Sequence, residues 1–152
     1  MIFTAEKDGF ILTTDKAKLD IISIHQYLST EAYWCKNVSI EIVKRSIDGS
    51  MCFGIFHGQR QVGFARVITD TATFGYLADV FIINDYRGRG LAKWLMQCIM
   101  GHSELQGFRS WMLATRDAHG LYSQFGFKPL EKPERIMRYG LFTEYPAMNE
   151  NK

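Results

Sequence analysis

The segment that most constrains the fold is 73–83, which carries large apolar residues at both odd and even positions. In an extended strand, successive side chains point to opposite faces, so this segment would be apolar on both of its faces. A strand of that kind is stable in the middle of a sheet that is covered on both sides. The pattern therefore predicts an α/β protein with a central strand at 73–83.

The hydrophobic pattern elsewhere predicts a mixture of helices and strands. Apolar residues at helical spacing predict helices at 19–28, 40–47, 91–101 and 118–125, and Ser39 is placed to cap the second of them. Further strands are predicted at 10–13, 51–57, 61–69, 110–114, from 127 onward and at 135–139. The predicted order is β-α-α-β-β-β-α-β-α-β-β, a mixed, largely antiparallel central sheet of about six to seven strands flanked by about four helices.

The length and charge of the chain limit the classes of protein to which it can belong. With 152 residues and a net charge of +2, it fits one domain and has no overall charge that would favour nucleic acid or a membrane. Its three cysteines form no CxxC pair, and its four histidines show no metal-ligand spacing. We therefore expect a cytoplasmic protein without a catalytic metal, a signal peptide or a membrane span.

The segment 85–91 joins the central strand to the helix at 91–101 and contains Gly88 and Gly90. Glycine lets the backbone wrap closely around a ligand, and the first N–H groups of a helix lack intrahelical acceptors. With the helix dipole and the charges of Arg87 and Arg89, these groups favour an anion such as phosphate. The spacing fits neither a GxxxxGK[ST] loop nor a GxGxxG fingerprint, and a solvated turn is the alternative.

Two motifs resemble those of the GNAT superfamily of N-acetyltransferases. The run Arg87-Gly88-Arg89-Gly90-Leu91-Ala92 is similar to its (Gln/Arg)-x-x-Gly-x-(Gly/Ala) signature, which holds the pyrophosphate of acetyl-CoA. Tyr122 followed by Gly126-Phe127 resembles its second motif. The motifs stand in the family's order, and the resemblance covers nearly the whole chain. It implies a GNAT-like fold with a single acetyltransferase domain at 1–143, and we expect the polar residues 144–152 to form a mobile tail.

The resemblance implies acetyl-CoA as the acyl donor and places its contacts on the loop, the preceding strand and the second motif. The cofactor-binding residues would be Val80, Phe81, Ile82, Arg87, Gly88, Arg89, Gly90, Ala92, Lys93, Thr115 and His119. Tyr122 resembles the residue that protonates the departing thiolate, although a tyrosine here can also be a packed aromatic residue. Many family members have Asn where this chain has Thr115, so their amide contact to the cofactor is not implied.

Asp79 interrupts an otherwise apolar strand beside the cofactor segment, and a buried carboxylate is costly without a purpose. We predict it to be the general base for the amine, with binding of the substrate's ammonium group or bonding to a loop as the alternatives. His119 is the second candidate for the base. Tyr33, Trp34 and Asp70 are predicted to contact an amine substrate, although aromatic residues in loops also cover core edges.

The leading hypothesis is an acetyl-CoA-dependent N-acetyltransferase in which a primary amine attacks the thioester directly. The alternative is a non-catalytic acyl-CoA-binding or regulatory module, which the presence of Tyr122 disfavours. A nucleic-acid-binding domain using Arg87, Arg89, Arg109, Arg116 and Lys128 fits poorly with the low net charge. A small-molecule amine and a protein or peptide amine both remain open as acceptors. The sequence also leaves open the acyl-chain preference and the oligomeric state, a homodimer included.

Overall fold

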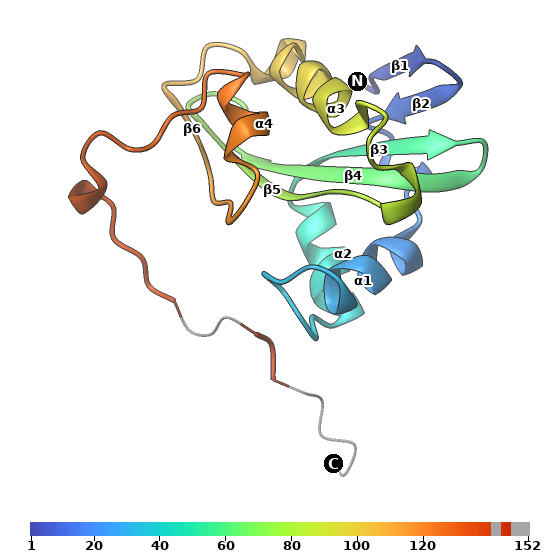
Figure 1. Cartoon of the computed structure of the whole chain (residues 1–152), viewed down its shortest axis with the longest axis horizontal. Helices are drawn as coiled ribbons and strands as arrows, with labels where there is room; N and C mark the ends of the chain where they lie inside the picture. Colours follow the sequence, from blue (N-terminus) through green and yellow to red (C-terminus); the bar gives the residue numbers. More distant parts are fainter. Residues whose placement is uncertain (141–143, 147–152) are drawn as a thin grey trace.

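The computed structural model describes residues 1–140 and 144–146, and within these residues six strands form one mixed sheet (Figure 1). The strands are β1 (Thr4–Lys7), β2 (Phe10–Thr13), β3 (Met51–His57), β4 (Arg60–Thr69), β5 (Phe74–Ile82) and β6 (Ser110–Leu113). They lie side by side in chain order. Neighbouring strands are antiparallel except β5 and β6, which run parallel. The predicted α/β class with a mixed, largely antiparallel sheet is confirmed.

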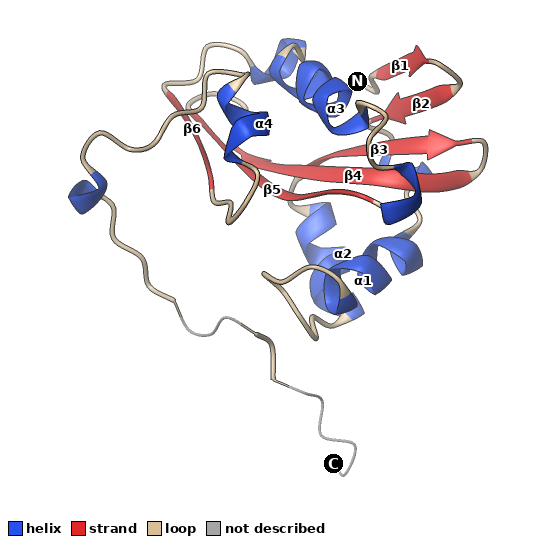
Figure 2. Ribbon diagram, viewed as in Figure 1, coloured by secondary structure: helices blue, strands red, loops and turns tan. Residues whose placement is uncertain are grey.

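Four α-helices in the described residues cover the two faces of this sheet: α1 (Ile21–Thr30), α2 (Ile40–Asp48), α3 (Leu91–Met100) and α4 (His119–Ser123). Figure 2 shows α1 and α2 below the sheet, and α3 and α4 above it. The Ser39 hydroxyl caps α2 as predicted, accepting a hydrogen bond from the Ile42 N–H at 3.3 Å. None of the described helices is long and apolar enough to cross a membrane.

The sheet divides the core into two layers. On one face, α3 packs Leu95 and Ile99 against the strands, and on the other α1 and α2 contribute Ile24, Leu28 and Val43. Burying a side chain of this size stabilises the fold by about 1.5–3 kcal/mol, so both layers hold the helices firmly. Every position of β5 is buried or half-buried between them, as its two apolar faces require.

The strand β1 is not among the predicted elements. It carries little apolar alternation and is mostly exposed. It forms because Asp8 and Gly9 adopt positive φ angles of 51° and 83°, which lets the chain turn tightly and pair β1 with β2. This Asp-Gly pair is a hairpin signal that the sequence does contain.

The two strands predicted from 127 onward and at 135–139 do not form, so this part of the prediction was wrong. Residues 128–140 are exposed and leave the domain, with a 3₁₀ turn at Pro133–Arg135 (Figure 1). Pro129 and Pro133 lack the N–H group that a strand donates to its neighbour, which disfavours pairing in a sheet.

The predicted mobile tail, 144–152, lies partly outside the described residues, which end at 146. Within the described part, the Tyr145 N–H donates to the Lys36 carbonyl at 3.0 Å. The Asn37 amide donates to the Glu144 carboxylate at 3.1 Å. Residues 144–146 are therefore held against the loop between α1 and α2.

Candidate active site

A groove opens where β5 and β6 diverge. The two strands pair only from Phe74 with Ser110 to Leu77 with Leu113, whereas β5 continues to Ile82. The backbone beyond Leu77 therefore has no strand partner on its β6 side within the described chain. The resulting space, the β5–β6 groove, has a volume of about 670 Å³. Its lining includes Val80, Phe81 and Ile82, the three β5 residues predicted to contact the cofactor.

A β-bulge turns Asp79 out of the regular strand pattern. Phe64 pairs with Phe81 and Arg66 with Ala78, so the register between β4 and β5 slips by one residue at this point. Asp79 has a φ of 54°, a left-handed conformation that aspartate tolerates better than most residues. Such a bulge re-aims side chains and increases the local twist. Asp79, the predicted base, lines a cavity next to the groove and does not line the groove itself.

The loop before α3 has the geometry of an anion site. Gly88 and Gly90 have φ angles of 79° and 76°, and a Cβ atom on either would meet no protein atom within 4 Å. The backbone conformation and open space for a ligand therefore explain these glycines, whereas internal packing does not. Gly90 is the N-cap of α3 and provides no side-chain cap. The first N–H groups of α3 are thus available to an external acceptor.

The side chains of the two arginines in this loop are used within the protein. The Arg87 guanidinium donates to the Ile82 carbonyl at 2.9 Å and to the Tyr27 hydroxyl at 2.8 Å. The Arg89 guanidinium lies 4.8 Å from the centre of the Tyr86 ring. Arg87 lines the groove, as do Gly88, Gly90, Ala92 and Lys93, but Arg89 does not. The Arg87 and Arg89 side chains thus hold the loop in shape, and Arg87 also lines the groove.

Tyr122 on α4 lies where the groove meets a second cavity of about 850 Å³. Its side chain is 9% exposed, and its ring packs edge-on against Phe127. Burial raises the pKa of its hydroxyl to about 12, with smaller contributions from Tyr33 and Asp117. Tyr122 therefore keeps its proton at neutral pH, as a tyrosine with the ordinary pKa also does.

Tyr33 and Trp34, both predicted to contact the substrate, line the groove and the second cavity. The Tyr33 hydroxyl accepts a hydrogen bond from the Arg116 N–H at 2.9 Å, and the Arg116 guanidinium lies 3.9 Å from the centre of its ring. The Trp34 indole N–H donates to Asp79 Oδ1 at 2.8 Å. Through these contacts, the loop after α1 is bonded to Asp79 on β5 and to Arg116 in the segment after β6.

Arg66 is a residue of the site that the sequence analysis missed. Its Nε donates to Asp79 Oδ2 at 2.7 Å, and its Nη1 donates to the Ser50 hydroxyl at 3.0 Å. The Arg66 and Asp79 side chains are only 15% and 11% exposed. A signal was available, since Arg66 interrupts one apolar strand and Asp79 the next with the opposite charge. Both oxygens of Asp79 are thus engaged, one by Arg66 and one by the Trp34 loop.

The structure does not bring Asp70 or His119 to the site. The Asp70 carboxylate accepts hydrogen bonds from the Thr73 hydroxyl at 2.6 Å and the Thr73 N–H at 2.7 Å, which lower its pKa and shape the turn between β4 and β5. His119 is exposed at the start of α4, and neither residue lines the groove or the second cavity. Thr115 lines the second cavity, where its hydroxyl accepts from the Ala118 N–H at 3.0 Å.

Metal ligands do not cluster in the described chain: no group of three or more His, Cys, Asp or Glu side chains there could hold a metal ion.

Comparison with known proteins identifies similar chains. The family model of the acetyltransferase (GNAT) domain matches residues 48–129, from the end of α2 to beyond α4. A candidate acetyltransferase from Gibberella zeae is 29% identical, over 78% of this chain and 78% of its own length. The crystal structure of a candidate GNAT acetyltransferase from Xanthomonas campestris is 47% identical, with a TM-score of 0.87, over 90% of this chain and 96% of that chain. A GNAT acetyltransferase from Elizabethkingia anophelis, solved with acetyl-CoA bound, has a TM-score of 0.62 at 12% identity, over 82% of this chain and 80% of that chain.

Proposed function

Because this chain belongs to the GNAT family of acetyltransferases, we propose that it transfers an acetyl group from acetyl-CoA to a primary amine that attacks the thioester directly. The observation that carries the proposal is that the β5–β6 groove and the second cavity meet at Tyr122. A donor in the groove and an amine in the second cavity would come together beside a buried hydroxyl group. The acetyl-CoA bound to the Elizabethkingia protein supports the choice of donor.

The groove suits the two parts of such a donor. The N–H groups at the start of α3 would donate hydrogen bonds to the negative pyrophosphate, and Gly88 and Gly90 leave room for it to approach the backbone. Within the described residues, the backbone of Val80–Ile82 has no strand partner on its β6 side, and it would bond the amide groups of the pantetheine arm as a further strand does. The donor supplies the activated acetyl thioester.

As the C–S bond breaks, Tyr122 would donate its proton to the departing sulfur, and the proton that the attacking amine loses would return to Tyr122 through solvent. A thiol has an ordinary pKa of about 8.5. The CoA sulfur therefore leaves more readily when a nearby group donates a proton to it as the C–S bond of the thioester breaks. We assign Asp79 a positioning role, because its oxygens already hold Arg66 and Trp34. By fixing Trp34 at the junction of the two spaces, it would orient the amine toward the donor.

Cys35 supports direct attack over a covalent acetyl-cysteine route. It lines the second cavity, but burial raises the pKa of its thiol to about 12, and the thiol donates to the Leu28 carbonyl at 3.2 Å. A thiol that stays protonated is a poor nucleophile. We expect the Cys35→Ala variant to keep its kcat within about threefold of the wild type, measured as release of CoA thiol. A loss of turnover in a folded Cys35→Ala protein would contradict direct attack.

Replacing Gly90 with alanine is expected to raise the KM for acetyl-CoA about tenfold and to change kcat little. The φ of 76° costs an L-residue about 1–2 kcal/mol, and the new methyl group would stand where the pyrophosphate is proposed to bind. Gly58→Ala is the matched control, because Gly58 also has a positive φ of 61° with open space around it but lies in the β3–β4 turn. Equal changes in KM for both variants would argue against the proposed loop site.

The function itself is tested by mixing the purified protein with acetyl-CoA and a broad panel of primary amines. We expect free CoA thiol and an acetylated amine to form together, and only when donor and acceptor are both present. Initial-velocity plots should intersect, as they do when both substrates are bound before reaction. Tight binding of CoA without turnover on any amine would instead support a non-catalytic acyl-CoA-binding module.

A further inference from the structure

The second cavity, in which the proposed function places the amine, is partly walled by apolar surface. Four large apolar side chains that are 36–42% exposed line it: Tyr33, Trp34, Ile42 and Ile68. Tyr76 of β5 lines it as well. Exposed apolar surface inside a cavity favours a ligand with an apolar or aromatic body. The volume of about 850 Å³ lies within the range of small-molecule sites.

The charged side chains of the second cavity carry one net positive charge. Three arginines and two aspartates line it: Arg66, Arg116, Arg138, Asp79 and Asp117. Arg66 Nε lies 2.7 Å from Asp79 Oδ2, and Arg116 lies 3.6 Å from Asp117 Oδ2. Each aspartate is therefore paired with an arginine. Among the described residues, Arg138 has no ion-pair partner.

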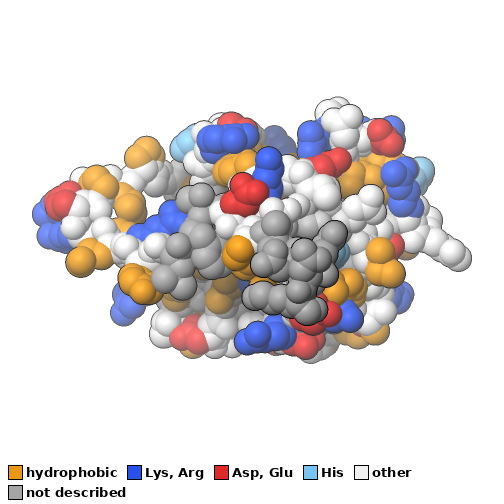
Figure 3. All heavy atoms as spheres, turned by 90° about the horizontal axis from the view of Figure 1, so that it is seen from below, with side chains coloured by type: hydrophobic (Ala, Val, Ile, Leu, Met, Phe, Trp, Pro, Cys, Tyr) orange, Lys and Arg blue, Asp and Glu red, His pale blue; other side chains and the backbone are white. Residues whose placement is uncertain are grey.

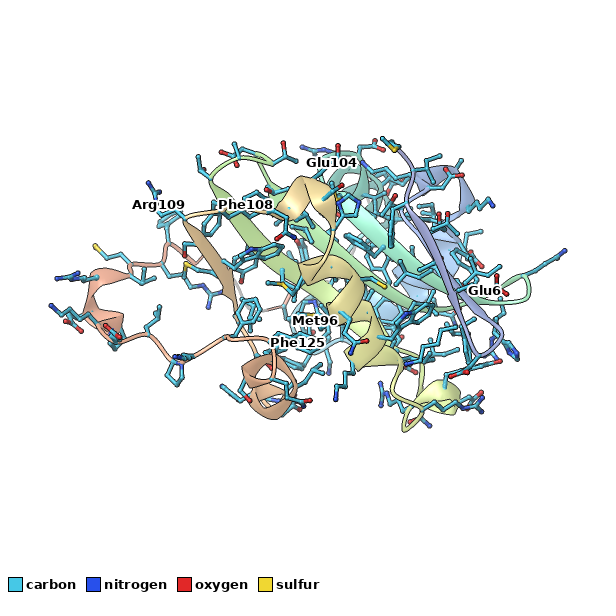
Figure 4. All side chains as sticks on the ribbon, turned by 90° about the horizontal axis from the view of Figure 1, so that it is seen from above. Glu6, Met96, Glu104, Phe108, Arg109 and Phe125 are labelled. Carbon is cyan, nitrogen blue, oxygen red and sulfur yellow. The ribbon has the colours of Figure 1, made fainter. Side chains whose placement is uncertain are left out.

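The exposed segment 128–140 carries Arg138 to this cavity. The segment extends from the domain after α4, beyond the β6 end of the sheet (Figures 1 and 4). Further along the chain, Tyr145 also lines the cavity, and its N–H donates to the Lys36 carbonyl at 3.0 Å. Figure 3 shows hydrophobic and charged side chains together at this end of the molecule. A ligand in the cavity would thus meet apolar walls and a guanidinium group.

This arrangement disfavours an acceptor whose charges are all positive. A carboxylate commonly binds an ammonium group, but both oxygens of Asp79 already accept hydrogen bonds, from Arg66 and Trp34. The Asp117 side chain is 69% exposed and paired with Arg116, so solvent weakens its attraction for a cation. A polyamine would find no free buried carboxylate among the described residues of the cavity.

An acceptor with a negative group would instead complement Arg138. A guanidinium can bind a carboxylate through two parallel N–H bonds, which fixes the orientation of the ligand as well as its charge. One unpaired arginine balances one negative charge, which favours a carboxylate over a doubly charged phosphate group.

We propose that the acceptor is a small amine with an apolar or aromatic body and a carboxylate, and that the Arg138 guanidinium binds this carboxylate. The amine nitrogen would lie near Tyr122, where the cavity meets the β5–β6 groove. Acetyl transfer is unchanged: the N–C bond forms, the C–S bond breaks, the sulfur gains a proton and the nitrogen loses one. Amino acids with apolar side chains are the simplest compounds of this class. This inference rests on the proposed function and names the class of its acceptor.

Three matched series of amines test the proposal: L-phenylalanine, L-leucine and L-methionine, each with its amide and with the amine that lacks the carboxyl group. In at least one series, we expect the kcat/KM of the amino acid to exceed that of both analogues about tenfold or more. Each value refers to the neutral amine, because the amino groups of the acid and the amide differ in pKa.

Two variants show whether Arg138 causes the preference. Arg138→Gln should remove the advantage of the carboxylate, whereas Arg135→Gln should keep it, because Arg135 is an exposed arginine of the same segment that does not line the cavity. Both side chains are exposed, so both variants should fold. Analogues used as well as the amino acid in every series would overturn the proposal. Equal losses in the two variants would also overturn it.

Isothermal titration calorimetry separates a failure of this inference from a failure of the proposed function. The same compounds are titrated into the protein in the presence of CoA, which carries no acetyl group to transfer. Binding of an amino acid that weakens about tenfold in Arg138→Gln, but not in Arg135→Gln, would support this class of ligand even if no acetylated product formed. Turnover of amines without any advantage for a carboxylate would overturn the inference and leave the acetyltransferase function standing. Neither binding nor turnover of any amino acid would also overturn it.

Discussion

Replacing Tyr122 with phenylalanine is expected to lower kcat about 100-fold while the KM for acetyl-CoA changes less than about threefold. General acid catalysis contributes typically about 10²–10⁴-fold, and the substitution removes only the hydroxyl that would protonate the leaving sulfur. The ring stays, so its packing against Phe127 is retained. Steady-state rates of thiol release with a saturating amine measure the effect. Ser123→Ala is the control, since it removes a hydroxyl from the same helix but from a residue that lines neither space.

The pH dependence gives a second measure of the role of Tyr122. Because its pKa is about 12, the tyrosine stays protonated well above neutral pH. We therefore expect activity to rise as the acceptor amine loses its proton, without a decline from Tyr122 below about pH 10.

The stability of the fold should respond to pH in the opposite direction. A tyrosine ionises near pH 10 in the unfolded chain, whereas Tyr122 ionises near pH 12 in the folded protein. Its contribution to the free energy of unfolding is therefore complete below pH 10 and is lost as pH rises toward 12. A kcat unchanged in Tyr122→Phe would refute the assignment.

Breaking the Arg66–Asp79 pair is expected to produce the largest loss of stability among single changes in the site. Arg66→Met should lower the free energy of unfolding by about 3 kcal/mol, because it leaves the carboxylate of Asp79 buried without its cation. Asp79→Asn should cost less than Arg66→Met, since the amide oxygen can still accept from Trp34 and asparagine tolerates the positive φ. Urea unfolding of both variants measures these losses.

The double variant Arg66→Met/Asp79→Asn completes the cycle. It removes both charges, so it should be more stable than the sum of the single losses predicts, with a coupling energy of about 1–3 kcal/mol. Strictly additive losses would mean that the two side chains do not stabilise each other.

The same two variants distinguish a positioning role of Asp79 from the predicted role as general base. If Asp79 holds Trp34 and Arg66 in place, Arg66→Met and Asp79→Asn should both raise the KM for the amine and leave the shape of the pH profile unchanged. If Asp79 takes the proton of the amine, Asp79→Asn alone should lower kcat about 100-fold or more and remove the acidic limb of the profile.

Much of the fold could be predicted, because the central strand and the flanking helices follow from local hydrophobic periodicity. The hairpin of β1 and β2 was missed although Asp8-Gly9 signals it, since the strand itself carries little apolar pattern. The predicted C-terminal strands failed because the alternation in 135–139 says nothing about whether a neighbouring strand is present. Pro129 and Pro133 were the better guide to that segment.

Some residues of the candidate site could also be predicted from the sequence, and others could not. The loop at Gly88 and Gly90 follows from a short local motif, and Tyr122 from the resemblance to the family's second motif. All three residues line one groove. Asp70 and His119 were chosen for their chemistry and their place in the chain, but the hydrogen bonds of a local turn and exposure at a helix start keep them away from it.

By itself, the sequence determined the α/β class, the uncapped start of α3 and the motif that contains Tyr122, because each depends on residues close together in the chain. Only the tertiary structure decided that Asp79 meets Arg66, 13 residues away, and Trp34, 45 residues away. The physical reason is that these contacts depend on the slip in register at the β4–β5 bulge and on how the loop after α1 packs over it. Strand register and packing arise from the whole sheet, and no short segment encodes them.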